Sequence, residues 1–235
     1  MNIPQAREIN RDRAESLLAM AAGKGFSQSY LAMKHQLIIE GADGWLAKIY
    51  LPLTQNWLGA EGFSEKSDSH FSLVLIRAGQ AAVGYFHQGA LLDHKVLRAY
   101  MVRQKQGFSQ IKHLKTKGKS RAGSRIRLAE TQRFFEEINE RLNSYAERFP
   151  MDFWGISCAK TMWPFYFDSS IPPPFSQKDQ NLLELPMHIS QASYEELVSA
   201  GALLGKFHLL LSGRGKAVFG DDLDKVSDIE DEDNW

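Results

Sequence analysis

The chain has 235 residues, of which 43% are hydrophobic and 24% are charged, and its 28 basic residues balance 28 acidic residues. A single cysteine, Cys158, excludes a disulfide within the chain and fits a reducing compartment. The most apolar stretch, residues 197–211, is interrupted by Lys206 and His208 and is too short and polar to span a bilayer. The N-terminus lacks the apolar run of a secretion signal, so we expect a cytoplasmic protein without membrane contact.

The first 60 residues are predicted to form an N-terminal extension of helices and strands. Apolar residues recur at helical spacing and Gly23 and Gly25 follow them, whereas later runs alternate around a glycine-containing turn. Helices are expected at 6–22 and 27–34, and strands at 37–39 and 45–53. The polar segment 56–70 is predicted to be a boundary loop.

Residues 61–215 are predicted to form one α/β domain with a mixed sheet. Three closely spaced apolar runs predict an antiparallel meander, with a turn at residues 78–80. The expected strands are 71–77, 81–88, 93–103, 154–159 and 182–189, with a loop at 164–174. Helices are expected at 124–148, where apolar residues recur at helical spacing, and at 190–211.

Basic residues are concentrated between Lys95 and Arg127, a segment with eleven Lys or Arg residues and no Asp or Glu. Such a segment cannot be buried, because each unpaired buried charge costs several kcal/mol. It must face water or a polyanion. A loop with the sequence Gln106-Gly107-Phe108-Ser109-Gln110 lies inside this segment, which indicates a group presented to a phosphate-bearing partner, most simply RNA.

Residues 216–235 are predicted to be an acidic disordered tail. Between Asp221 and Trp235 the chain has eight acidic residues and one lysine. Charge runs of this kind are usually solvated. The alternative is a mimic of RNA that folds back onto the basic segment.

The basic segment resembles a known signature. It contains His94-Lys95, then Tyr100 and Arg103 in a Tyr-x-x-Arg pattern, then Lys105-Gln106-Gly107-Phe108-Ser109-Gln110. A basic Ser-Arg-Ala-Gly turn and an arginine-bearing helix follow, at 120–127. This order is similar to that of the release-factor-like domain in the VMS-type peptidyl-tRNA hydrolases. The ankyrin repeats and zinc finger of eukaryotic members are not found in the sequence, which resembles a minimal prokaryotic branch.

The resemblance implies a ribonuclease H-like α/β fold, related to the catalytic domain of eukaryotic and archaeal peptide release factors. It also implies hydrolysis of peptidyl-tRNA on stalled large ribosomal subunits by a monomer, with no metal and no organic cofactor. Gln110 would position the attacking group, and Gly107 and Ser109 would shape the loop. The residues expected to contact RNA are Arg98, Arg103, Lys105, Phe108, Lys112, His113, Lys115, Arg125 and Arg127.

Two other functions stay open. Phe108 stands where the family has glycine, which favours a non-catalytic module that binds tRNA or ribosomal RNA. Cleavage of RNA near the tRNA 3′ end is the second alternative, in which His94 or His113 would act as the base. An adaptor that binds proteins through the acidic tail is a third class.

Overall fold

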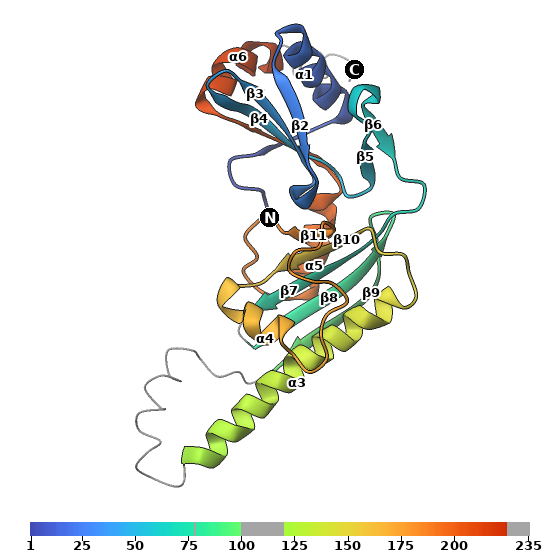
Figure 1. Cartoon of the computed structure of the whole chain (residues 1–235), viewed down its shortest axis with the longest axis vertical. Coiled ribbons are helices and arrows are strands. Elements are labelled where there is room, and N and C mark those ends of the chain that lie inside the picture. The colour runs from blue at the N-terminus through green and yellow to red at the C-terminus, as the bar shows by residue number, and fades with distance from the viewer. Residues whose placement is uncertain (78, 100–119, 225–235) are drawn as a thin grey trace, which may run out of the picture. The chain divides into compact units, whose positions relative to one another are not determined.

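The computed structural model describes residues 1–77, 79–99 and 120–224, and within 120–128 and 221–224 only the helical backbone is described. The chain divides into two compact units. The central unit consists of residues Asp68–Gly201, and the terminal unit combines Asn2–Ser67 with the described residues from Ala202 onward (Figure 1). Each unit has its own five-stranded sheet and its own apolar core.

The sheet of the central unit is mixed. Its strands are β7 (His70–Arg77), β8 (Gln80–His87), β9 (Ala90–Arg98), β10 (Phe153–Ser157) and β11 (Leu182–Glu184), in the spatial order β11-β10-β7-β8-β9. The first three form an antiparallel meander, as the sequence predicts, and β10 and β11 lie parallel to β7. The edge strand β9 therefore leads directly into residues 100–119.

Helices cover both faces of this sheet. On one face, Ile138 and Leu142 of α3 (Ser120–Ala146) are fully buried in a core that includes Val83 of β8. Side chains alternate along a strand, so Phe86 points to the other face. There it meets α5 (Tyr194–Leu204) so closely that a Cβ on Gly201 would lie 2.3 Å from the Phe86 ring. The N-terminal end of α3 extends past the edge of the sheet (Figure 1).

The terminal unit is an antiparallel sheet in the order β1-β12-β4-β3-β2, packed against two helices. The strands are β1 (Arg7–Ile9), β2 (Ser27–Leu31), β3 (Gln36–Gly41), β4 (Gly44–Tyr50) and β12 (Phe207–Leu211), and the helices are α1 (Arg11–Gly23) and α6 (Gly213–Asp224). A short hairpin of β5 (Gln55–Trp57) and β6 (Phe63–Glu65) occupies the segment for which the sequence predicts a loop. Both ends of the described chain thus contribute to one sheet.

One expected helix is wrong and another is correct only in part, because strand pairing overrides local preference. Residues 27–31 are not helical: they pair in register with β3, from Ser27 opposite Glu40 to Leu31 opposite Gln36. The expected closing helix ends at Leu204, and Phe207–Leu211 becomes strand β12 between β4 and β1. An apolar run suits either structure, and the partners that decide it are distant in sequence.

Three smaller differences complete the comparison with the sequence. Trp163–Phe167 form the short helix α4, with a proline in its first turn, rather than a loop. The strand expected at 182–189 is limited to β11. Residues 216–224, expected to be disordered, lie in α6, and 225–235 lie outside the described residues. Within the described ranges, none of the helices has the length and apolarity needed to cross a bilayer.

Candidate active site

The structure describes β9 and α3, the elements before and after the candidate loop, which together are called the frame. The loop itself lies outside the described residues. Strand β9 ends at Arg98 and helix α3 begins at Ser120, so these two elements hold the two ends of the loop segment 100–119. The predicted catalytic residues, Gln110, Gly107 and Ser109, lie outside the described residues. The same holds for most of the predicted RNA contacts, which are Arg103, Lys105, Phe108, Lys112, His113 and Lys115. Their roles therefore stay predictions.

Three predicted RNA contacts fall on the described frame. Arg98 is the last residue of β9 and its side chain is exposed. Arg125 and Arg127 lie in the first turns of α3, where only the backbone is described. Along the chain, Arg98 therefore precedes the predicted catalytic loop, and Arg125 and Arg127 follow it.

A glycine turn fixes the point where the chain leaves β9. The backbone N–H of Ala99 donates a hydrogen bond to the Gly79 carbonyl, at 2.9 Å. Gly79 has a φ of +78°, which favours glycine, and a Cβ at this position would lie 2.5 Å from the Ala99 carbonyl oxygen. The turn between β7 and β8 therefore holds the last described residue before the loop.

The arginine of β7, Arg77, forms hydrogen bonds within the fold. Arg77 ends this strand, and its Nε donates to the carbonyl of Ile189 at 2.7 Å. Its Nη1 donates to the carbonyl of Ile76 at 2.9 Å, and Nη2 bonds the Ser157 hydroxyl at 3.3 Å. Burial lowers the pKa of this guanidinium from its usual value. Arg77 is therefore a structural residue, in contrast to the exposed Arg98.

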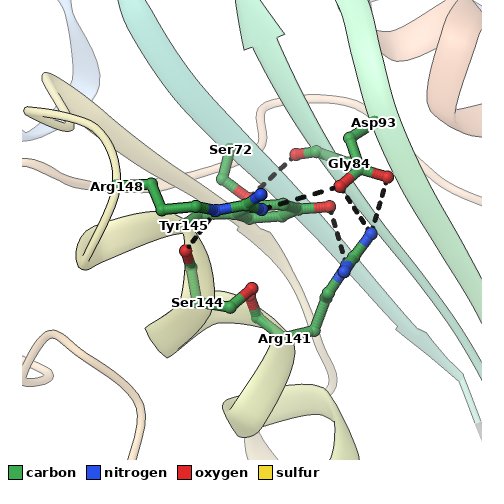
Figure 2. A network of polar contacts seen from close by, with 7 residues as sticks. All are labelled: Ser72, Gly84, Asp93, Arg141, Ser144, Tyr145 and Arg148. Atoms are coloured by element: carbon green, nitrogen blue, oxygen red, sulfur yellow. Dashed lines mark hydrogen bonds and ion pairs between the residues drawn. The ribbon is translucent and has the colours of Figure 1, made fainter.

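A polar network ties α3 to the strand that delivers the loop (Figure 2). Asp93 on β9 accepts two hydrogen bonds from Nη2 of Arg141, at 2.6 and 2.5 Å, and lies 3.8 Å from Nη2 of Arg148. Arg141 Nε also donates to the hydroxyl of Tyr145 at 3.1 Å. The guanidinium of Arg141 lies 5.1 Å from the centre of the Tyr145 ring. One carboxylate is shared by two guanidinium groups, and these contacts hold helix and strand together.

Sequence reasoning missed this network, although a signal was present. Residues 141, 145 and 148 are spaced by four and three, which places them on one helix face. Asp93 is an isolated acid in the sequence, and its partner Arg141 lies 48 residues away. Burial also raises the pKa of the Tyr145 hydroxyl, which therefore stays protonated and acts as a hydrogen-bond partner.

His94, the residue weighed as a base for RNA cleavage, lies on β9 with an exposed side chain. Its ring centre is 4.6 Å from that of Tyr194 at the start of α5. Asp152 accepts a hydrogen bond from the backbone N–H of His70, at 2.8 Å. Asp152 therefore positions the backbone at the start of β7.

Two surface hollows of the central unit are unsuited to phosphate. One, of about 400 Å³, lies between α3 and α4 and contains Glu136 and Asp168 among its lining residues. The other, of about 580 Å³, is lined by prolines, aromatic rings and Asp179. Neither has a lysine or arginine in its lining.

A single family model matches a region that includes β9, the loop segment and α3. Residues 71–210, more than half of the chain, match the family described as Bacteroidetes VLRF1 release factor. The chain belongs to this release factor family. The match begins in β7 and includes the loop segment and α3, so it confirms the predicted release-factor-like resemblance of this region.

Other comparisons are more distant. A solved structure described as "Vms1 mitochondrial localization core" aligns over 86% of this chain and 84% of its own length, at 11% identity and a TM-score of 0.41. No curated protein matches this VLRF1 release factor chain significantly.

Proposed function

We propose that this VLRF1 family member is a hydrolase that acts on peptidyl-tRNA at stalled large ribosomal subunits. The observation that carries the proposal is the position of the Gly107-Phe108-Ser109-Gln110 segment. It lies within the matched family region and, along the chain, between the exposed Arg98 and the arginine-bearing start of α3. Family membership supports a role in translation, and the position of this segment supports a site where the tRNA end could enter.

The fold proposed for the central unit is ribonuclease H-like. The strand order β9-β8-β7-β10-β11 supports it, with three antiparallel strands followed by two strands parallel to the first. This arrangement leaves the loop after the third strand and before the first long helix. A glutamine in that loop would be presented at one end of the sheet.

The chemistry of the proposed site is positional. Ester hydrolysis needs a water molecule placed against the carbonyl carbon and donors for the developing oxyanion. The Gln110 amide can supply both contacts without titrating, Gly107 would let the backbone pass close to the tRNA end, and Ser109 would bind the terminal ribose. Arg98, Lys105 and Lys112 would hold phosphates, and each such contact adds to the salt dependence of binding.

The deciding experiment compares wild-type protein with Gln110→Ala on ribosomal subunits stalled with a labelled peptidyl-tRNA. Peptide release by the wild type and its loss in Gln110→Ala, with equal binding to the subunits, is the expected result. Sequencing the tRNA 3′ end identifies the bond: an intact end means ester hydrolysis, and a shortened end means RNA cleavage. Equal binding without release by either protein would overturn the hydrolase proposal.

A non-catalytic RNA-binding module is the second candidate, and Phe108 is the observation that favours it. A phenylalanine in place of glycine removes backbone freedom from the loop but offers a ring for base stacking. Under this second function, Phe108→Gly would weaken RNA binding without creating peptide release. If Phe108→Gly instead released peptide faster than wild type, the phenylalanine would be a brake on a functional hydrolase.

A further inference from the structure

Three side chains able to bind a metal meet at the end of the β7–β8 hairpin. His70 is the first residue of β7 and His87 is the last residue of β8, and the two lie directly opposite each other in the antiparallel register. Asp68 precedes β7 by two residues. The rings of His70 and His87 are stacked, with centres 4.7 Å apart.

The donor atoms of these side chains converge. Asp68 Oδ1 lies 3.0 Å from His70 Nε2 and 2.8 Å from His87 Nε2, and all three donor atoms are within 4.8 Å of one another. Tetrahedral Zn²⁺ with bonds of roughly 2.0–2.1 Å places neighbouring ligand atoms about 3.3–3.4 Å apart. The two separations from Asp68 need to open by only a few tenths of an ångström, and the two Nε2 atoms, which lie within 4.8 Å of each other, would have to reach the same spacing. Asp68 can provide this movement, since its side chain is 65% exposed.

The orientation of the His70 ring is fixed by a hydrogen bond at Nδ1, the nitrogen that does not face Asp68. Its Nδ1 lies 2.8 Å from the hydroxyl of Tyr85, which is buried and stacked on Phe149 with ring centres 4.1 Å apart. The backbone N–H of His70 donates to Asp152. A histidine that binds a metal through one nitrogen generally has such a partner on the other, because it sets the tautomer and the ring orientation. Tyr85 leaves Nε2 of His70 directed toward Asp68.

The kinds of donor select the kind of metal. Two imidazole nitrogens and one carboxylate oxygen suit a divalent transition-metal ion such as Zn²⁺, whereas Mg²⁺ and Ca²⁺ prefer oxygen ligands. Three protein ligands leave a fourth tetrahedral position for water. Hydrogen bonds from His87 and His70 also lower the pKa of the Asp68 carboxyl, so it is anionic at neutral pH.

This cluster is separate from the candidate active site. The loop segment follows Arg98, which lies opposite Gln80 and so adjoins the Arg77 end of β7, whereas His70 is at the other end of that strand. Seven residues of extended strand separate the two ends by about 24 Å. A metal here would join the end of the hairpin to the segment before β7 rather than take part in hydrolysis.

We propose that Asp68, His70 and His87 form a binding site for one Zn²⁺-type divalent metal ion, which clamps the end of the β7–β8 hairpin. The sequence contains no Cys/His zinc motif, and the resemblance to the VMS family implied no metal, so the site is visible only in the fold. Binding replaces hydrogen bonds to Asp68 with metal bonds from both Nε2 atoms, and a neutral imidazole that carried its proton on Nε2 then carries it on Nδ1, which in His70 faces the Tyr85 hydroxyl.

The test uses the full chain stripped with a chelator and titrated with ZnCl₂ by calorimetry. One equivalent should bind, and the melting temperature should rise by several degrees. CoCl₂ should give the visible absorption of a four-coordinate ion. His87→Ala and Asp68→Asn should both lose stoichiometric binding, and circular dichroism would verify their folding.

The matched control is His188→Ala, which removes an exposed histidine of the same unit and should bind like wild type. Asp68→Asn is expected to fold, because it alters an exposed side chain and keeps its size, so a loss of binding in this variant would not result from misfolding. Wild-type protein that binds no Zn²⁺, or variants of the cluster that bind as tightly as wild type, would overturn the proposal. Asp68 would then be a carboxylate that bridges two imidazoles by hydrogen bonds alone.

Discussion

Asp93 on β9 and Arg141 on α3 form a two-point contact, in which both carboxylate oxygens accept hydrogen bonds from the same guanidinium nitrogen (Figure 2). These residues belong to the two elements that hold the ends of the candidate catalytic loop. The side chains are partly screened from water, with exposures of 36% and 27%. The contact is therefore stronger than an exposed ion pair, and it ties α3 to β9.

Replacing Asp93 by Asn should lower the free energy of unfolding by about 1–2 kcal/mol. The estimate takes the usual value for hydrogen bonds to charged groups, reduced for partial exposure. The change leaves Arg141 and Arg148 near each other without their shared anion. Urea denaturation of both proteins would measure the effect.

The control for that change is Glu137→Gln, which breaks an exposed pair with Arg133 on the same helix. Its expected cost is only about 0.3–0.5 kcal/mol, typical of an i, i+4 pair on a helix surface. Equal costs for the two variants would mean that the Asp93 contact does not stabilise the frame.

Gly79→Ala should impair the candidate site more than its stability cost explains. The new Cβ would have to occupy space 2.5 Å from the Ala99 carbonyl oxygen, at a φ of +78°. The strain of such a backbone is of order 1–3 kcal/mol, and relief requires Ala99 to move, which shifts the start of the loop. Peptide release and RNA affinity, measured where the variant is still fully folded, should both fall.

Gly25→Ala separates these two effects. Gly25 has a φ of +73°, but a Cβ added there would have no neighbouring atom within 4 Å, and the residue lies in the terminal unit. It should lose stability through backbone strain alone and keep full activity per folded molecule. If both variants lost activity in proportion to stability, the Gly79 turn would have no special role in positioning the loop.

The stability of the terminal unit should fall between neutral and mildly acidic pH because of His35. This side chain is 2% exposed, and burial lowers its pKa from 6.5 to about 4. Its Nδ1 lies 2.6 Å from the Tyr30 hydroxyl and its Nε2 lies 2.9 Å from the Pro52 carbonyl oxygen. The folded state thus favours the neutral ring, which can donate to one partner and accept from the other.

The sign follows from the direction of this shift. The unfolded histidine takes up a proton near pH 6.5, whereas the folded one does so near pH 4. The contribution is present above pH 6.5 and is lost as the pH falls toward 4. Between about pH 7.5 and about pH 5 the loss should be about 2 kcal/mol. Urea denaturation at both values should give a smaller difference for His35→Gln than for wild type, whereas the exposed His188→Gln should behave like wild type.

The central sheet could be predicted from the sequence because its information is local. Continuous apolar runs and a glycine turn specify β7 and β8, and apolar residues at helical spacing specify α3. Strand β12 could not be predicted in this way. Its run of apolar residues suits a helix equally well, and only pairing with β4 and β1, which lie far away in sequence, makes it a strand.

The candidate sites differ in the same respect. The loop signature around Gln110 is contiguous, and the family match confirms the relation of this region to release factors. The Asp68, His70 and His87 cluster depends on register instead. His70 lies opposite His87 only in the observed register, because symmetry about the predicted turn at 78–80 would place residue 70 opposite residue 88. The Asp93 and Arg141 contact depends on tertiary packing between residues 48 positions apart.

Arg98→Gln should weaken RNA binding by removing a phosphate contact, and it should make the remaining binding less dependent on salt. Arg98 is the exposed residue at the end of β9, next to the loop segment. A lost phosphate contact should lower the slope of log K against log salt concentration by about 0.7–0.9. Titration of labelled tRNA at several salt concentrations would measure it. Arg133→Gln removes an exposed arginine of α3 that is paired with Glu137, and its slope should equal that of wild type. If the Arg98 variant kept the wild-type slope, RNA would have to approach the loop from the α3 side, because the end of β9 would then contribute no phosphate contact.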